Sequence, residues 1–95
     1  MSANGIPIVL FRLGRIVATP NALAKLSQQD IMTAIQRHQP GDWGDVCDDD
    51  RQANNCALTD ATRLFSVYHS ENQLKFWIIT EADRSVTTLL LPEDY

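Results

Sequence analysis

The sequence predicts a single α+β domain spanning residues 1–95, with an N-terminal strand, two or three short helices, and then a three-stranded antiparallel meander packed on the helices. Helix signals occupy the middle of the chain, whereas runs of β-branched and aromatic residues occupy its last third. The composition, 44% hydrophobic and 21% charged over 95 residues, is that of one ordinary globular domain.

The N-terminal part of the chain is expected to form a strand followed by a helix. Residues 8–19 are rich in β-branched and aromatic side chains, and Gly14 is expected to mark a bend in the strand. Thr19 followed by Pro20 predicts a helix start. A threonine hydroxyl caps free backbone N–H groups, and proline at the first helical position gives up an N–H that has no partner there.

Two more helix starts follow. Ser27, three residues before Asp30, predicts a capping box, so this region is expected to hold two short helices or one helix broken at Ser27. The helix is expected to end near His38 because Pro40-Gly41 cannot continue it. Asp48–Asp50 predicts the start of a third, short helix, because acidic groups favour the positive end of the helix dipole. Its apolar stripe is expected to contain Ala53, Cys56, Ala57 and Leu58.

The last third predicts strands over residues 63–69, 74–80 and 86–91, joined by short turns. Side chains alternate across a strand, so the sheet has two apolar faces. One face is expected to hold Leu64, Tyr68, Phe76, Ile78 and Leu90. The other is expected to hold Phe65, Val67, Trp77, Ile79, Leu89 and Leu91. The helices can cover one face, and the other then needs the N-terminal segment, a second copy or another protein.

Charge and composition disfavour several classes of function. The net charge of −4 and scattered basic residues argue against direct nucleic-acid binding. The chain has no signal-peptide pattern and no apolar stretch long enough to span a membrane, so a cytoplasmic location is expected. Cys47 and Cys56 are expected to be thiols, and no metal or cofactor is expected. A zinc site formed with His38 and His69 is the alternative.

Several sequence blocks occur in an order typical of one family. They are residues 13–20, 37–38, 41–45, 77–85 and 87–95. Together they resemble a family of small bacterial proteins carried by plasmids, phages and integrated elements, called "plasmid-related protein" or "type I restriction endonuclease subunit M". The resemblance covers residues 13 to 95 and implies a mobile-element setting. It implies no DNA methylation, because so short a chain cannot hold both a Rossmann-like sheet for S-adenosylmethionine and a pocket for a flipped base.

The acidic segment between the second and third helices is one candidate interaction site. It contains Asp42, Trp43, Asp45, Asp48, Asp49 and Asp50. The carboxylates can serve helix capping and solubility, bind a divalent cation, or mimic nucleic-acid phosphate and dock on a basic partner. The tryptophan is expected to plug the edge of the core, with presentation for binding as the alternative.

Two further candidates lie on the meander. Phe65, Trp77 and Ile79 would form an apolar interaction surface if their face of the sheet stays uncovered. In the turn after the second meander strand, Arg84 is expected to pair with Glu81 or Asp83, or alternatively to reach the 42–45 loop.

The expected function is that of a non-enzymatic accessory protein of a mobile element, acting by protein–protein interaction. Inhibition of a host defence system, by anti-restriction or anti-CRISPR action, fits a small acidic chain. A RelE/ParE-like toxin or ribonuclease is the alternative, with Arg63, Lys75, Arg84 and Tyr68 as its candidate residues. A homodimeric module is a further alternative, and a Cys47 or Ser85 nucleophile lacks a recognisable base in the sequence.

Overall fold

The computed structural model describes residues 8–95 and contains four strands, three α-helices and a short 3₁₀ turn. In chain order these are β1 (Arg15–Ala18), α1 (Pro20–Lys25), α2 (Gln28–His38), α3 (Asp48–Asp60), β2 (Leu64–His69), β3 (Lys75–Thr80), β4 (Val86–Leu90) and η1 (Pro92–Asp94). The α+β class is confirmed, and the meander is joined by β1 into a single four-stranded sheet.

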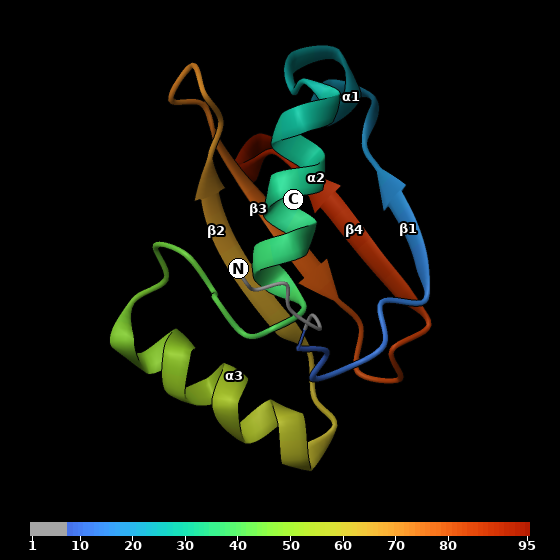
Figure 1. Cartoon of the computed structure of the whole chain (residues 1–95), viewed down its shortest axis with the longest axis vertical. Coiled ribbons are helices and arrows are strands. Elements are labelled where there is room, and N and C mark those ends of the chain that lie inside the picture. The colour runs from blue at the N-terminus through green and yellow to red at the C-terminus, as the bar shows by residue number, and fades with distance from the viewer. Residues whose placement is uncertain (1–7) are drawn as a thin grey trace.

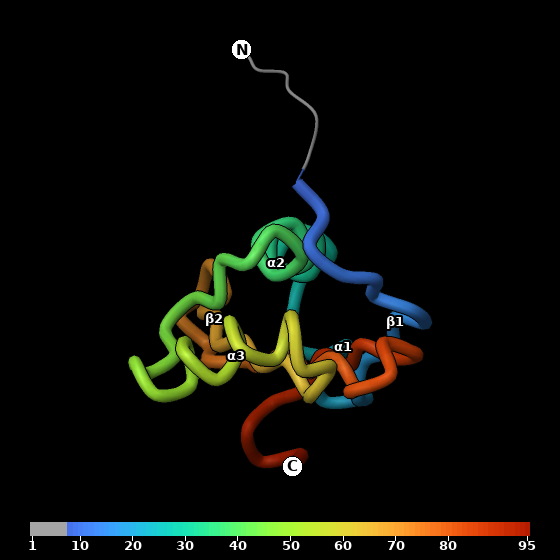
Figure 2. The backbone as a smooth tube through the Cα atoms, turned by 90° about the horizontal axis from the view of Figure 1, so that it is seen from below, coloured from blue at the N-terminus to red at the C-terminus, as the bar shows by residue number. Residues whose placement is uncertain are grey.

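The strand order is β1-β4-β3-β2, in which β2, β3 and β4 are antiparallel neighbours and β1 runs parallel to β4 at the edge (Figure 1). Viewed along the sheet, α2 and the segment that starts at Ile8 lie on one side, and the C-terminal turn lies on the other (Figure 2). We call the side towards α2 the inner face and the opposite side the outer face. No helix among residues 8–95 is long and apolar enough to cross a membrane.

The predicted helix starts are confirmed. The Thr19 hydroxyl accepts a hydrogen bond from the Ala22 backbone N–H at 3.2 Å, with Pro20 in the first turn. Ser27 and Asp30 form a complete capping box, with bonds of 3.0 and 3.2 Å. These local signals fix both helices because the caps satisfy N–H groups that have no partner within the helix.

The N-terminal strand is shorter than expected, and the segment before it packs on the inner side. Gly14 has φ of +66°, which turns the chain before β1 begins. The Leu10 N–H donates to the Gln39 carbonyl at 3.1 Å, and the Gln39 side chain donates to the Phe11 carbonyl at 2.9 Å. Residues 8–13 are therefore tied to the end of α2, and the idea that they cover the outer face is wrong.

The expected face assignment of β4 is also wrong. Cross-strand neighbours share a face, and Ile78 pairs with Leu89 while Trp77 pairs with Leu90. Leu89 and Leu91 therefore belong to the inner core, and Leu90 lies on the outer face. The cause is the length of the turn. Four residues lie between the paired positions 81 and 86, whereas the expected faces required an odd number. A change of one residue in the turn moves every side chain of the next strand to the other face of the sheet.

Helix α3 differs from expectation in its length and its buried stripe. It is 13 residues long and ends at Asp60, followed by Ala61 as the cap in a left-handed conformation with φ of 57°. Asn54 and Ala57 are its buried residues, whereas Ala53 and Cys56 are exposed, so the expected stripe is rotated by about one residue. Because Asn54 is polar, the buried face could not be recognised by hydrophobicity alone.

The buried Asn54 closes the free edge of β2. Its side-chain oxygen accepts from the Phe65 N–H at 3.0 Å, and its amide donates to the Phe65 carbonyl at 2.6 Å. Val67 lies two residues further along the same edge. The Val67 N–H donates to the Trp43 carbonyl, and the Val67 carbonyl accepts from the Asp45 N–H. The outward backbone groups of Phe65 and Val67 are thereby satisfied, which protects this part of the edge from pairing with another chain.

A hydrogen-bonded polar chain crosses the inner core. His38 is fully buried, with Nδ1 at 2.5 Å from the Ser66 hydroxyl and Nε2 at 2.9 Å from the Thr80 hydroxyl. The Thr80 hydroxyl lies 2.8 Å from the Thr87 hydroxyl, which donates to the Leu13 carbonyl at 2.7 Å. Each polar group in this chain therefore has a partner, as buried polar groups require.

The Leu13 carbonyl at the end of this chain fixes the donor in each hydrogen bond as far as Nε2 of His38. A carbonyl can only accept, so Thr87 donates to Leu13, Thr80 donates to Thr87, and Nε2 of His38 donates to Thr80. The Ser66 hydroxyl can either donate to Nδ1 or accept from it, so the protonation of Nδ1 is decided by burial, which favours the neutral imidazole with Nδ1 as the acceptor. Burial, with a smaller contribution from the charge of Arg84, lowers the pKa of His38 to about 3, in agreement with this arrangement.

Candidate interaction surface on the outer sheet face

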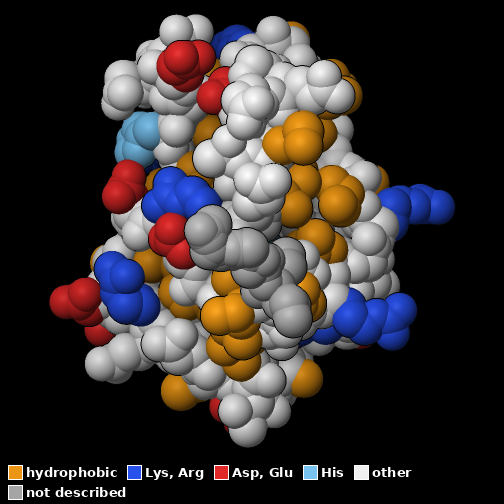
Figure 3. Space-filling model, viewed as in Figure 1, with side chains coloured by type: hydrophobic (Ala, Val, Ile, Leu, Met, Phe, Trp, Pro, Cys, Tyr) orange, Lys and Arg blue, Asp and Glu red, His pale blue; other side chains and the backbone are white. Residues whose placement is uncertain are grey.

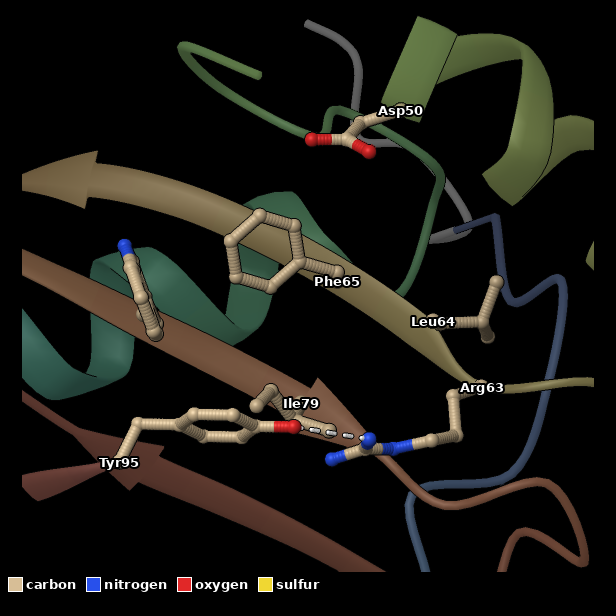
Figure 4. Close-up of a pocket in the computed structure, with 7 residues that line it drawn as sticks. Asp50, Arg63, Leu64, Phe65, Ile79 and Tyr95 are labelled. Carbon is tan, nitrogen blue, oxygen red and sulfur yellow. Dashed lines mark hydrogen bonds between the residues drawn. The ribbon is translucent and has the colours of Figure 1, made fainter. Parts of the chain in front are cut away.

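A hollow of about 310 Å³ lies on the outer face of the sheet where β2, β3, the first turn of α3 and the C-terminus approach one another. Its lining residues, most of them labelled in Figure 4, are Asp50, Arg63, Leu64, Phe65, Trp77, Ile79 and Tyr95. We call this site the outer-face hollow.

Aromatic and aliphatic side chains form the floor of the hollow. The rings of Phe65 and Trp77 meet edge to face with centroids 5.1 Å apart, and both residues are half-buried. Ile79 lies beside them on β3 and is 6% exposed. These residues project to the same side because cross-strand pairing places Phe65 opposite Ile79.

Arg63 and Tyr95 form one wall of the hollow. The Arg63 guanidinium donates to the Tyr95 hydroxyl at 3.2 Å, the dashed contact in Figure 4, and also forms an ion pair with Glu81 at 3.5 Å. The Tyr95 ring meets Trp77 edge to face at 5.9 Å. The hydrogen bond to Tyr95 raises the pKa of Arg63, so the guanidinium stays protonated.

The C-terminal turn is held in place by Asp94. Its carboxylate accepts from the Thr19 hydroxyl at 2.6 Å, from the Asn21 amide at 2.7 Å and from the Leu91 N–H at 3.1 Å. The hydrogen bond from Thr19 is the largest cause of the lowered pKa of Asp94. The start of α1 therefore positions Tyr95 over the sheet.

The other wall is acidic. Asp48, Asp49 and Asp50 occupy the first turn of α3 and are all exposed, and Asp50 lines the hollow. Arg51 approaches Asp48 at 3.8 Å, an exposed ion pair that contributes little to stability. The hollow thus has an apolar floor between a basic and an acidic wall.

The structure brings four of the twelve sequence candidates together here: Asp50, Phe65, Trp77 and Ile79. Sequence reasoning did not assign Arg63 or Tyr95 to this surface, although the position of Arg63 directly before a strand rich in apolar residues was a usable signal.

The 42–45 loop is a structural element. Asp42 receives two hydrogen bonds from Arg37, at 2.8 and 3.2 Å, which lower the pKa of that carboxyl. Asp45 lies 2.9 Å from a ring nitrogen of His69. Trp43 is 3% exposed and donates to the Asn55 side chain at 3.2 Å, so its expected role as a plug is confirmed and its presentation for binding is wrong.

Arg84 binds backbone carbonyls, and both expected ion-pair arrangements are wrong. Its guanidinium donates to the carbonyls of Thr62, Glu81, Ala82 and Ala57, at 2.6, 3.1, 3.3 and 2.9 Å. The Glu81 carboxylate pairs with Arg63 instead, and Asp83 accepts from Ser85. Arg84 therefore joins the end of α3 to the β3–β4 turn.

The other groups considered for chemistry are dispersed. Residues 8–95 contain no group of three or more His, Cys, Asp or Glu side chains placed to hold a metal ion, and Cys47 and Cys56 are exposed free thiols. Among the toxin candidates, Tyr68 is buried and donates to the Asp42 carbonyl at 2.6 Å on the inner side, whereas Arg63 lies on the outer side. Ser85 donates its hydroxyl to Asp83.

Comparison of the chain with family models, curated proteins and solved structures finds no match in any of the three.

Proposed function

We propose that this protein is a non-enzymatic binding module that docks a protein partner through the outer-face hollow. The observation that carries the proposal is the junction, at one place, of an apolar sheet surface, an Arg63–Tyr95 wall and the acidic first turn of α3. The partner is expected to insert an apolar side chain into the hollow and to place basic groups against Asp48–Asp50.

The residue types support a protein partner. Tryptophan, tyrosine and arginine are the side chains that most often dominate the binding energy of protein interfaces, and Trp77, Tyr95 and Arg63 surround the hollow. A volume of about 310 Å³ lies at the lower end of the range for small-molecule pockets, roughly 300–1,000 Å³. It suits one or two side chains of a partner better than a large cofactor.

The setting we propose is inhibition of a host defence system in the cytoplasm, by anti-restriction or anti-CRISPR action. Enzymes that handle nucleic acid carry basic surfaces that neutralise phosphate. A chain of net charge −4 with three exposed consecutive aspartates has the charge to compete for such a surface. A mobile-element origin, which is itself an expectation from the sequence blocks, would supply this setting.

Affinity capture from a nuclease-treated bacterial lysate, read by mass spectrometry, tests the proposal. We expect one stoichiometric partner whose capture weakens with added salt. It should be lost with Tyr95→Ala and with Asp48→Asn/Asp49→Asn/Asp50→Asn.

The matched control removes the same three charges elsewhere, as Asp60→Asn/Glu71→Gln/Glu93→Gln, at exposed positions. The control should retain the partner. Equal capture by all variants, or capture of no partner, would contradict docking through the hollow.

A further inference from the structure

A second exposed apolar surface lies on the opposite side of the sheet. Residues 8–95 contain seven exposed large hydrophobic side chains, and four of them lie on α2 or in the N-terminal segment beside it: Ile8, Val9, Leu10 and Met32, which are 65%, 58%, 46% and 50% exposed. A groove of about 360 Å³ runs between the N-terminal segment and the end of α2, lined by Ile8, Val9, Ile35, Gln36, Gln39 and Pro40. A cluster of this kind marks an interaction site more often than scattered exposed residues do.

The exposed face of α2 carries no net charge. Its solvent-facing residues at helical spacing are Gln28, Gln29, Met32, Thr33 and Gln36. Arg37 is the exposed charged residue of α2, and its charge is balanced by the ion pair with Asp42 at 2.8 Å. In the view onto α2, acidic and basic side chains lie mainly along the two sides of the molecule (Figure 3). We call this face, together with Ile8–Leu10, the α2 surface.

We propose that the α2 surface is a homodimer interface, occupied by the α2 surface of a second copy of this chain. Two copies each carry a net charge of −4, so repulsion opposes any approach through the acidic first turn of α3. The α2 surface has no net charge, because Arg37 is paired with Asp42, and it lets two copies meet without that repulsion.

The polar groups of the α2 surface also fit a symmetric contact. A two-fold axis brings identical patches together, so the patch must complement itself. Glutamine amides and threonine hydroxyls both donate and accept hydrogen bonds, and they can therefore pair with copies of themselves. Depletion of charge and the presence of methionine are also typical of the core of an interface.

This proposal is independent of the outer-face hollow, because α2 covers the inner face and the hollow lies on the outer one. A dimer formed through α2 leaves both hollows free for a partner. The two proposals can therefore fail separately.

Sedimentation equilibrium of the full chain, from about 1 μM to about 1 mM, tests the proposal over the usual range of dimer affinities. We expect the mass to rise from 10.7 kDa towards twice that value. Met32→Glu should raise the dissociation constant at least about tenfold, because it places two like charges across the two-fold axis.

Leu23→Glu is the matched control: it makes the same kind of change at a 61% exposed apolar residue of α1, outside the α2 surface. It should leave the dissociation constant unchanged, and circular dichroism should show that both variants keep the fold. A mass of 10.7 kDa at about 1 mM, well above ordinary dissociation constants, would overturn the proposal. Equal weakening by both variants, or a dimer abolished by Tyr95→Ala but not by Met32→Glu, would also overturn it.

Discussion

At the scale of single residues, a buried histidine links α2 to two strands. His38 connects Ser66 of β2 with Thr80 of β3, and the chain continues through Thr87 of β4 to the Leu13 carbonyl. The rings of Phe11 and Trp43 enclose the imidazole at centroid distances of 5.1 and 5.6 Å. Protonation would add a charge where each nearby group already has a partner, so the neutral ring is strongly preferred.

This environment predicts a loss of stability in mild acid. The pKa of His38 is near 6.5 in the unfolded chain and about 3 in the folded one, so below pH 6.5 the unfolded state binds more protons. The free energy of unfolding should fall by about 2 kcal/mol between pH 6.5 and pH 5, because the slope approaches ~1.4 kcal/mol per pH unit. Urea unfolding across this range measures it.

A His38→Gln variant separates this cause from others. Its stability should be lower at pH 7, but it should lack most of the slope between pH 6.5 and pH 5, since glutamine does not titrate. The carboxyl groups with a lowered pKa, such as Asp42, take up protons only near and below pH 4, so they do not cause a slope between pH 6.5 and pH 5. An unchanged slope in the variant would show that another group causes the acid sensitivity.

Arg84 gives a second prediction at this scale. Arg84→Ala should lower the free energy of unfolding by about 2–3 kcal/mol, because hydrogen bonds from a charged donor to the Ala57 and Thr62 carbonyls are lost. That loss corresponds to a melting temperature lower by roughly 10 °C for a domain of this size. Arg84→Gly also loses these bonds but relaxes the left-handed backbone at φ of 62°, so it should melt higher than the alanine variant. An unchanged melting temperature for Arg84→Ala would contradict this role.

At the scale of elements, the closed edge of β2 depends on Gly44. A Cβ atom at this position would lie 2.0 Å from the Val67 carbonyl oxygen, a backbone atom that cannot move without breaking the bridge between these residues. We expect Gly44→Ala to destabilise the protein by about 3 kcal/mol, combining the cost of a positive φ with the steric clash.

Gly41→Ala is the comparison for that prediction. Gly41 also has a positive φ, of +93°, but an added Cβ would meet the flexible end of the Leu10 side chain at 2.9 Å. The alanine variant should therefore cost less, about 1 kcal/mol. Thermal unfolding of both variants measures the difference, and equal losses would show that contact with β2 is unimportant.

Local signals in the sequence predicted the helices and strands, whereas contacts between segments far apart in the chain could not be predicted from it. The caps at Thr19 and Ser27 are visible because each acts within three residues. The face of β4 depends on the parity of one turn, and the parallel pairing of β1 with β4 joins segments about 70 residues apart. The buried Ser66 and Thr80 were not assigned to the core, because a hydroxyl in a strand has no visible partner until His38 is placed beside it.

At the scale of the whole molecule, the C-terminal turn is bound to the start of α1, so contacts between distant parts of the chain shape the outer side of the sheet. Asp94 of η1 binds Thr19 at the start of α1, and this contact holds Tyr95 against Trp77. Part of the interaction surface was predictable from strand alternation, which placed Phe65, Trp77 and Ile79 together. Arg63, Tyr95 and Asp50 join them only through tertiary packing.

Loss of the Asp94 contact should uncover Trp77. We expect Asp94→Ala to increase quenching of tryptophan fluorescence by acrylamide, because the C-terminal turn would no longer hold Tyr95 over the sheet. Trp43 is 3% exposed and should contribute little to the change. The increase should disappear when Trp77→Phe is added, and an increase that persists would place its source at Trp43.

The central claim is that the outer-face hollow binds a protein partner, and the most direct test is NMR titration of the labelled protein with the captured partner. We predict that the largest amide shifts will occur at Asp50, Arg63, Phe65, Trp77 and Tyr95, around the hollow. Shifts concentrated on α2 or on the 42–45 loop, with these residues unaffected, would contradict the claim.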